Sequence, residues 1–338
     1  MQRIPLRILA LSMLLYCISS CQKEPIEPIY EPVYPAGFPP IIFPADNAPT
    51  AERILLGKKL FYSTALSRDN KLSCASCHLP QFAFADTVAF SEGTAGSIGK
   101  RNAPTIANIG YQTDLLFEGS VPDLERQVFV PIMAHHEFDF DINAIAERLN
   151  EQNDIVFLSQ KAYQRPPDPF VITRAIATFE RSLLSGNSPY DRYVSEQQPY
   201  AMSTSQQRGY QLFLSDSLAC ATCHSGFLFT DQSFQNNGLY EVYPDSGRIH
   251  FTRKSEDLAK FKVPSLRNIA QTAPYMHDGS KKTLSEVVEH YAKGGEQHPN
   301  KNPVLRGFSL TEQQKNDLIQ FLYALTDTSF CQNSLFLP

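Results

Sequence analysis

The pentapeptides Cys74-Ala75-Ser76-Cys77-His78 and Cys220-Ala221-Thr222-Cys223-His224 decide how this chain folds. Each has the form C-x-x-C-H, in which two thiols can bond to the vinyl groups of a haem while the adjacent imidazole binds its iron. A tetrahedral zinc site would need further Cys pairs, and the chain has only seven Cys. The sequence therefore predicts two covalently bound haems of the c type. The attachment residues would be Cys74, Cys77, Cys220 and Cys223, with His78 and His224 as proximal iron ligands.

Length and charge restrict what the chain can be. Its 338 residues suffice for two domains of ordinary size, and each half contains one pentapeptide. The formal net charge of -5, to which haem propionates would add, argues against a nucleic-acid partner. The three remaining cysteines, Cys17, Cys21 and Cys331, are too few for a disulfide framework.

The N-terminus has the pattern of an export signal. Basic residues precede an apolar run at Ile8–Ile18, which is too short to span a bilayer. The run ends in Ile18-Ser19-Ser20-Cys21, which looks like a bacterial lipobox, so we expect residues 1–20 to be cleaved and Cys21 to be lipidated. An ordinary signal peptide with an incidental Cys is the alternative. The Pro-rich segment 21–50 would then be a tether, and the protein would be in the periplasm or cell envelope.

An internal repeat relates the two halves. Four pairs of similar strings follow the same order in both: 57–61 and 209–213, 84–86 and 229–231, 103–109 and 263–269, and 117–120 and 277–280. Such self-similarity predicts two related haem domains, at 51–190 and 200–328. The polar segment from Ser185 to Ser205 is expected to be the loop that joins them.

Helices should supply most of the regular structure. Ile172, Ile176, Phe179 and Leu183 recur at helical spacing, as do apolar residues from Leu318 to Leu325. Ser309 and Glu312 suggest a capping box for the second of these helices. No sustained apolar alternation indicates a sheet, so the predicted fold class is mainly α.

The residues opposite the proximal histidines should differ between the halves. Thr283 and Glu286 form a capping box for a helix on which Leu284, Val288 and Tyr291 share one face. Tyr291 could therefore be the sixth ligand of the second iron, although a core tyrosine would give the same pattern. Met276 is the rival ligand.

In the first half, the repeat position of Tyr291 is Pro131, which cannot bind iron and leaves that haem open. Glu137 could move a proton between the oxygens of hydrogen peroxide, and burial would raise its pKa towards that task. Gln127 could hold the peroxide by hydrogen bonds. Both could instead be surface residues, and His135 or His136 could fill the open position.

At these strings the chain resembles a known family, the bacterial di-haem cytochrome c peroxidases, and within it the MauG-like branch. The resemblance runs from about Ala51 to Leu325. It rests on the following strings: 66–69, 101–105, Gln127 with Pro131 and Glu137, 261–268, and 272–279.

The resemblance implies two cytochrome c-like haem domains related by the repeat, with peroxide chemistry at the N-terminal haem beside Gln127 and Glu137. It also implies Tyr291, rather than Met276, on the second iron. A calcium ion between the haems is implied as well. Its ligands would be the side chain of Asn102 and the backbone oxygens of Thr272 and Pro274, which are hard donors.

Two departures from the family pattern stand out. The loop from Ser91 to Lys100 lacks the His of members that need reductive activation, so the first haem is expected to be open when oxidised. Phe117 replaces the family's Trp between the haems, and its ring is harder to oxidise. Rapid transfer of oxidising equivalents between the haems by way of this residue is therefore in question.

The sequence leaves three hypotheses for the function. The leading hypothesis is a peroxidase that reduces hydrogen peroxide to water with electrons from a small donor protein, a cytochrome c or a cupredoxin-like protein. The second is a MauG-like oxidase that modifies side chains of a partner protein. The third is a non-catalytic di-haem electron carrier. The expected partners also include a membrane, through the lipid anchor, and exclude nucleic acid.

Overall fold

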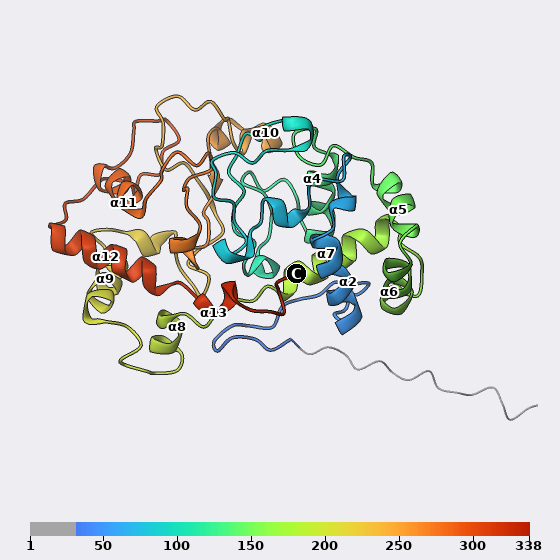
Figure 1. The fold of residues 1–338 in the computed structure, drawn as a ribbon. Helices are drawn as coiled ribbons and strands as arrows, with labels where there is room; N and C mark the ends of the chain where they lie inside the picture. The colour runs from blue at the N-terminus through green and yellow to red at the C-terminus, as the bar shows by residue number, and fades with distance from the viewer. Residues whose placement is uncertain (1–31) are drawn as a thin grey trace, which may run out of the picture.

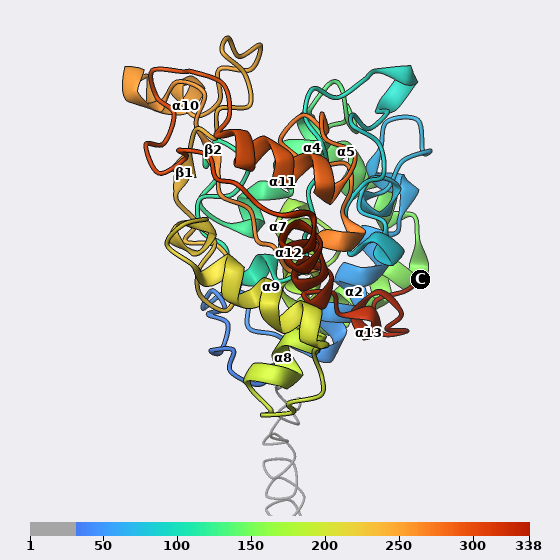
Figure 2. The same ribbon diagram turned by 90° about the vertical axis from the view of Figure 1, so that its left-hand side faces the viewer.

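The computed structural model describes residues 32–338, which fold into helices joined by long irregular segments (Figures 1 and 2). The helices of the first half are α2 (Ala51–Phe61), α3 (Leu124–Gln127), α4 (Phe129–Met133), α5 (Ile142–Asn150), α6 (Asn153–Tyr163) and α7 (Pro169–Ser182). Those that follow are α8 (Pro189–Val194), α9 (Thr204–Leu214), α10 (Ile249–Thr252), α11 (Leu284–Lys293), α12 (Glu312–Ala324) and α13 (Thr328–Cys331). The strands β1 (Phe234–Gln235) and β2 (Phe261–Lys262) pair antiparallel. The predicted mainly helical fold is confirmed.

A crossed pair of helices forms the centre of each half: α2 packs on α7, and α9 packs on α12. A Cβ atom added to Gly57 would lie 1.9 Å from the carbonyl oxygen of Ala175, and one added to Gly209 would lie 1.9 Å from that of Asp317. Only a glycine permits such close approach of the two backbones. This contact explains why a glycine recurs at the same place in the repeat.

Two asparagines from elsewhere in the chain bond to the C-terminal ends of α7 and α12 in the same way. Asn108 has a φ of 59° and donates its backbone N–H to the carbonyl of Leu183, the residue that ends α7. Asn268 has the same φ and donates to the carbonyl of Leu325, which ends α12. Asparagine tolerates this left-handed conformation better than most residues do. The repeat therefore conserves the geometry at the helix ends as well as at the crossings.

Apolar side chains fill the space between the helices of each half. In the first half the core gathers residues from α2, α5 and α7, including Leu60, Leu149 and Ile176. In the second it gathers Phe213 of α9 and Phe321 of α12. The two halves lie side by side, with α2 to α7 on one side of Figure 1 and α9, α11 and α12 on the other.

The described part of the predicted tether is packed against the body. Phe38 stacks edge-on against Tyr111 and Phe227, at ring-centroid distances of 5.8 and 4.8 Å. Asn47 is fully buried and donates its side-chain amide to Glu125. Residues 32–50 therefore contact both halves. The sequence predicted a tether that keeps the domain away from a membrane, whereas Phe38 and Asn47 of this segment are packed against the body of the protein.

The expected signal peptide, residues 1–20, and the lipidation residue Cys21 lie outside the described residues. Within residues 32–338, no helix is both long and apolar enough to cross a bilayer.

Two local expectations were wrong. The segment from Ser185 to Ser205 is not simply a loop, because it contains α8, which opens with a capping box between Ser188 and Asp191. The capping box of α12 joins Thr311 and Gln314 instead of Ser309 and Glu312. In both cases the chain offers several Ser, Thr, Glu and Gln residues close together, and the packing of the helix selects among them.

Candidate functional site: two haem pockets

The first pentapeptide forms a short 3-10 turn, η2 (Cys74–Ser76), in which the N–H of His78 bonds to the carbonyl of Cys74 at 2.9 Å. The imidazole donates from Nδ1 to the carbonyl oxygen of Phe84, also at 2.9 Å. Because a carbonyl can only accept, the proton belongs on Nδ1 and Nε2 keeps its lone pair for a metal. This arrangement is typical of an oriented histidine ligand.

The second pentapeptide repeats this geometry in η6 (Cys220–Thr222). The N–H of His224 bonds to the carbonyl of Cys220 at 3.0 Å, and its Nδ1 donates to the carbonyl of Phe229 at 3.1 Å. Phe84 and Phe229 occupy matching positions of the repeat. Burial lowers the pKa of both His78 and His224, which favours the neutral imidazole that binds iron. The two donor sets therefore fit covalently attached haem.

The predicted distal residues of the first pocket lie on neighbouring turns. Gln127 ends α3, Pro131 lies within α4, and Glu137 follows α4 in a tight turn. The carbonyl of Glu137 accepts a hydrogen bond from the N–H of Thr94 at 2.8 Å. The loop that begins at Ser91 thus holds the turn in place from the other side.

Glu137 is brought close to the first pentapeptide. Burial is the largest cause of the raised pKa at Cys74 and Cys77, and the charge of Glu137 raises it further at both thiols. The pKa of Glu137 itself is raised because it is partly withdrawn from water, while the neighbouring His136 opposes that shift. The side chain nevertheless remains 43% exposed. It can therefore reach both the pocket and a source of protons.

His135 and His136 are poorer candidates for a ligand of the first iron. The side chain of His135 is 94% exposed, and its Nδ1 lies 2.5 Å from a carboxylate oxygen of Asp139. The side chain of His136 is 47% exposed, with Nε2 3.8 Å from Glu137. A cavity of about 530 Å³ opens beside Cys77 under the loop from Ser91 to Gly96. Small molecules therefore have access to this side of the first pentapeptide.

In the second pocket, Tyr291 lies on α11, whose capping box between Thr283 and Glu286 was correctly predicted. The helix ends at Gly294, which has a φ of 80°. Burial is the main cause that raises the pKa of Tyr291. The phenol is therefore withdrawn from water.

Met276, the rival ligand, is near the same place. The side-chain amide of Asn237 donates to the sulfur of Met276 at 3.3 Å, and its backbone carbonyl accepts from His290, the residue next to Tyr291. Asn237 was missed by the sequence reasoning. No motif marks it, because its role comes entirely from contacts with residues far along the chain.

The junction between the halves carries charged and aromatic groups. Arg101 binds Asp245 of the second half through Nε at 2.6 Å and also pairs with Glu118. The backbone carbonyl of Phe117 accepts from the N–H of Lys262 at 2.8 Å. Burial lowers the pKa of Lys262 to about 8. Phe117 is thus held against the second half by its backbone.

Asn102, one of the residues expected to bind calcium, lies at this junction. Asn102 is 6% exposed, and its backbone N–H bonds to the carbonyl of His277 at 2.8 Å. Its side-chain nitrogen donates to the carbonyl of Val88 at 2.9 Å. Thr272 is also buried. Among residues 32–338, no group of three or more His, Cys, Asp and Glu side chains gathers as a metal site would require.

A buried carboxyl group near the first pocket was also missed. Glu180 of α7 is 6% exposed, and its Oε2 has no hydrogen-bond partner in the described structure. Burial raises its pKa to about 8, so the group is largely protonated at neutral pH. Its influence on the pKa of Cys74 places it beside the first attachment site.

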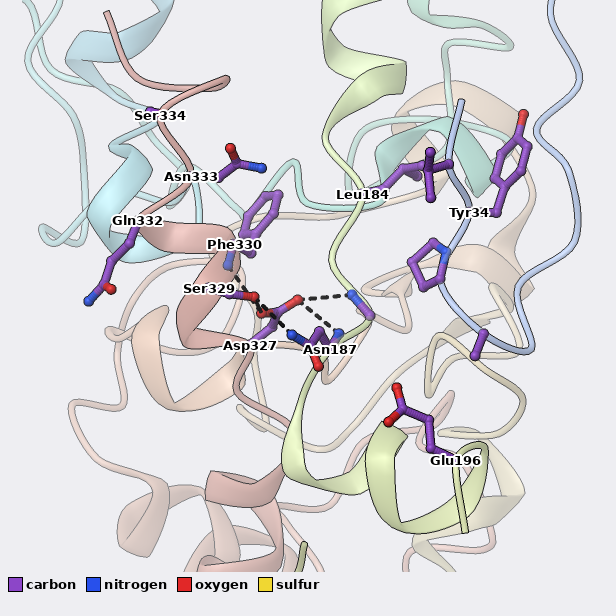
Figure 3. A pocket seen from close by; sticks show the side chains of 14 residues that line it. Tyr34, Leu184, Asn187, Glu196, Asp327, Ser329, Phe330, Gln332, Asn333 and Ser334 are labelled. Carbon is purple, nitrogen blue, oxygen red and sulfur yellow. Dashed lines mark hydrogen bonds between the residues drawn. The ribbon is translucent and has the colours of Figure 1, made fainter. Parts of the chain in front are cut away.

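Another cavity lies away from the pentapeptides. It measures about 560 Å³ and is bounded by residues 33–36, the connection after α7, and α13 (Figure 3). Asp327 lines this cavity and accepts hydrogen bonds from the N–H groups of Gly186 and Asn187 at 3.0 and 2.9 Å. No residue of either pentapeptide lines it. We interpret it as part of the joint between the halves.

Comparison with known proteins agrees with this geometry. The sequence model described as di-haem cytochrome c peroxidase matches residues 51–199, and that of cytochrome c matches residues 206–326. The methylamine utilization protein MauG of Methylorubrum extorquens is 35% identical over 83% of this chain and 80% of its own. The cytochrome-c peroxidase IdrP1 of Denitromonas iodatirespirans is 35% identical over 86% and 85%.

A solved structure, a MauG-like protein associated with microbial copper homeostasis, superposes with a TM-score of 0.84. It is 34% identical and covers 88% of this chain and 96% of its own. The chain therefore belongs to the di-haem cytochrome c peroxidase family. The predicted resemblance and the fold of two cytochrome c-like domains are confirmed, and the family implies two c-type haems.

Proposed function

We propose that this protein reduces hydrogen peroxide to water with electrons from a small donor protein, a cytochrome c or a cupredoxin-like protein. The observation that carries the proposal is the contrast at one repeat position. Pro131 offers no ligand at the repeat position of Tyr291, and Glu137 follows it in a turn that is bonded to Thr94, in the loop that lines a cavity together with Cys77.

Different residues of the chain would bind the haem, orient the peroxide and transfer its proton. A haem at the first pentapeptide, held by Cys74, Cys77 and His78, would supply the iron that accepts peroxide and the electrons that reduce it. Gln127, the last residue of α3, would orient the peroxide through its side-chain amide. Glu137 takes a proton from one peroxide oxygen and delivers it to the other through its carboxylate oxygens.

The surroundings of Glu137 suit this role. A general acid and base works best when its pKa lies near the working pH, and the pKa of Glu137 is raised from 4.5 in that direction. The partial exposure of the side chain allows the proton to be replaced from solvent. No histidine stands in the loop from Ser91 to Lys100, so we expect the first pocket to react without prior reduction.

The second pocket serves electron entry in this proposal. His224 and Tyr291 would hold its iron, with Met276 as the alternative to Tyr291. A phenolate ligand lowers the reduction potential relative to a thioether, so this haem would be a weaker electron acceptor than one with a Met ligand.

The second candidate function is oxidation of side chains on a partner protein. Its support is the 35% identity to MauG and the 34% identity to the MauG-like structure, together with Tyr291. The non-catalytic carrier is less well supported. It needs a histidine on the first iron, whereas His135 is exposed and bound to Asp139.

Several finer assignments form part of the proposal. The peroxidatic domain would be residues 51–190 and the electron-transfer domain residues 200–328. One calcium ion would be bound by the side chain of Asn102 and the backbone oxygens of Thr272 and Pro274. Export by residues 1–20 and lipidation at Cys21 would place the protein in the periplasm or cell envelope, on a membrane.

Optical and electron-spin-resonance spectra of the oxidised holoprotein, with and without hydrogen peroxide, test the proposal. We expect a high-spin signal from the first haem that changes on addition of peroxide, and steady oxidation of reduced cytochrome c. A wholly low-spin spectrum that peroxide leaves unchanged would overturn both enzyme functions. Peroxide consumption without oxidation of a donor protein would favour the MauG-like alternative.

A further inference from the structure

Asn237 lies between Tyr243 and the turn of α11 that carries Tyr291. Its Oδ1 accepts from the hydroxyl of Tyr243 at 3.3 Å. Its backbone carbonyl accepts a hydrogen bond from Nε2 of His290, the residue next to Tyr291 in α11, at 3.0 Å. Tyr243 is therefore connected to the turn that carries Tyr291 through a single, firmly positioned residue.

A third tyrosine extends this link outward. The rings of Tyr243 and Tyr240 meet edge to face, with centroids 5.5 Å apart. Both side chains are partly exposed, and Val242 between them is 82% exposed. The hydroxyl of Tyr240 donates to Oδ2 of Asp278 at 2.5 Å. The chain of contacts that leads from the turn of Tyr291 through Tyr243 thus ends at the surface, where the hydroxyl of Tyr240 is bonded to the carboxylate of Asp278.

We propose that Tyr243 and Tyr240 form a one-electron relay from the second haem pocket to the protein surface, and that Tyr240 is the site where external reductants are oxidised. The proposal rests on the proposed function, because hydrogen peroxide is the oxidant. It gives oxidising equivalents that have reached the second pocket an exit to the surface on the Tyr291 side, while the step between the two pockets still passes the junction at Phe117.

The electron balance of the relay is simple. Hydrogen peroxide takes up two electrons and two protons to give two molecules of water. Tyr240 supplies one electron at a time through Tyr243 towards Tyr291, and its phenolic proton moves to Asp278. A one-electron donor at the surface then reduces the Tyr240 radical, and Asp278 returns the proton.

Tyrosine is suited to this task for two reasons. Its neutral phenol becomes easy to oxidise only when its proton has somewhere to go, and a hydrogen-bonded carboxylate provides that acceptor at Tyr240. Phenylalanine has no such proton and no hydroxyl group. A Tyr→Phe change therefore removes the redox chemistry while it preserves the ring contacts.

The test uses the holoprotein with hydrogen peroxide and no donor, in the presence of the radical trap 2-methyl-2-nitrosopropane. Peptide mass spectrometry then locates the adduct. We expect labelling at Tyr240 that disappears in Tyr240→Phe and falls at least tenfold at Tyr240 in Tyr243→Phe. Tyr323→Phe is the matched control, because Tyr323 is 47% exposed on α12 in the same half.

The possible results separate the relay from the proposed function. Normal peroxide consumption with equal labelling of Tyr240 and Tyr323 would overturn the relay alone, as would unchanged Tyr240 labelling in Tyr243→Phe. Failure of the wild type to consume peroxide would overturn both proposals. The absorbance bands of both haems in each variant show whether the pockets are intact.

Discussion

The two haem pockets share a scaffold and differ where a ligand or substrate would bind. Both place a histidine Nδ1 on the carbonyl of a matching phenylalanine, and both finish their central helix with an asparagine in the left-handed conformation. The repeat position that holds Pro131 in α4 of the first half holds Tyr291 in α11 of the second. The comparison teaches that the repeat preserves the turn that presents each histidine, while the residue at this other position differs, and the proposed division of chemistry rests on that difference.

A second difference lies in the crossed helix pairs. The residue before Gly57 is the buried Leu56, which belongs to the same helix crossing as Ala175. The residue before Gly209 is Arg208, and it binds Asp317 through Nε and Nη2 at 2.7 and 2.8 Å. The first crossing is thus apolar, whereas the second contains an ion pair. The halves should therefore respond differently to pH.

Among the variants that test the difference between the pockets, Glu137→Gln should have the largest effect, on the rate of peroxide cleavage. The amide keeps the shape of the side chain but cannot shuttle a proton, so peroxide cleavage should slow by about 10²- to 10⁴-fold. Stopped-flow absorbance after mixing with peroxide measures the rate. Glu147→Gln, which changes an exposed carboxyl group on α5, is the control. An unaffected rate would remove Glu137 from the mechanism.

Tyr291→Phe sharpens the contrast from the other side. The change removes the phenolic oxygen, so the phenolate signature of the second haem should vanish from the optical and spin-resonance spectra, and its reduction potential should rise. Met276→Leu should leave that signature intact. If Met276→Leu alone alters the second haem, the ligand has been assigned wrongly.

Gly57→Ala and Gly209→Ala test whether the two scaffolds are equally tight. Each new Cβ would lie 1.9 Å from a backbone carbonyl oxygen, which cannot move without shifting a helix. We expect each variant to lose about 3 kcal/mol of unfolding free energy, at the upper end of overpacking costs. Denaturant unfolding of the holoprotein measures it. Gly99→Ala, whose Cβ would meet nothing closer than 3.5 Å, should be nearly neutral.

Asp317→Asn should have the smallest effect and should separate the halves by pH. The hydrogen bond from Arg208 is the main reason that the pKa of Asp317 falls from 3.8 to about 2. Its contribution to stability is therefore complete above pH 3.8 and is lost as the pH falls through 2. The variant should lose about 1 kcal/mol at pH 7 and depend less on pH between 4 and 2.

Thermal unfolding at several pH values measures this dependence, with Asp216→Asn at an exposed position as the control. An Asp317→Asn protein with the same acid sensitivity as the wild type would contradict the assignment of the effect to the second half.

Much of the molecule follows from local sequence. The spacing within each pentapeptide places two thiols and an imidazole on one short turn, which needs no contact with the rest of the chain. The helix of Tyr291 begins at its own capping box and ends at Gly294, so its apolar face is set by residues within three turns. Pro131 excludes a ligand by its covalent structure alone.

Other features exist only because distant segments meet. Asn237 acquires its role from Met276, Tyr243 and His290. The pKa of Glu180 is raised because α7 carries it into the protein away from water, and nothing near it in the sequence indicates this. The sequence by itself determined the two attachment pentapeptides, since their thiols and imidazole are neighbours along the chain, and it predicted that Pro131 and Tyr291 hold the same position of the repeat. Only the tertiary structure decided which polar groups surround them, because hydrogen bonds and desolvation depend on neighbours in space.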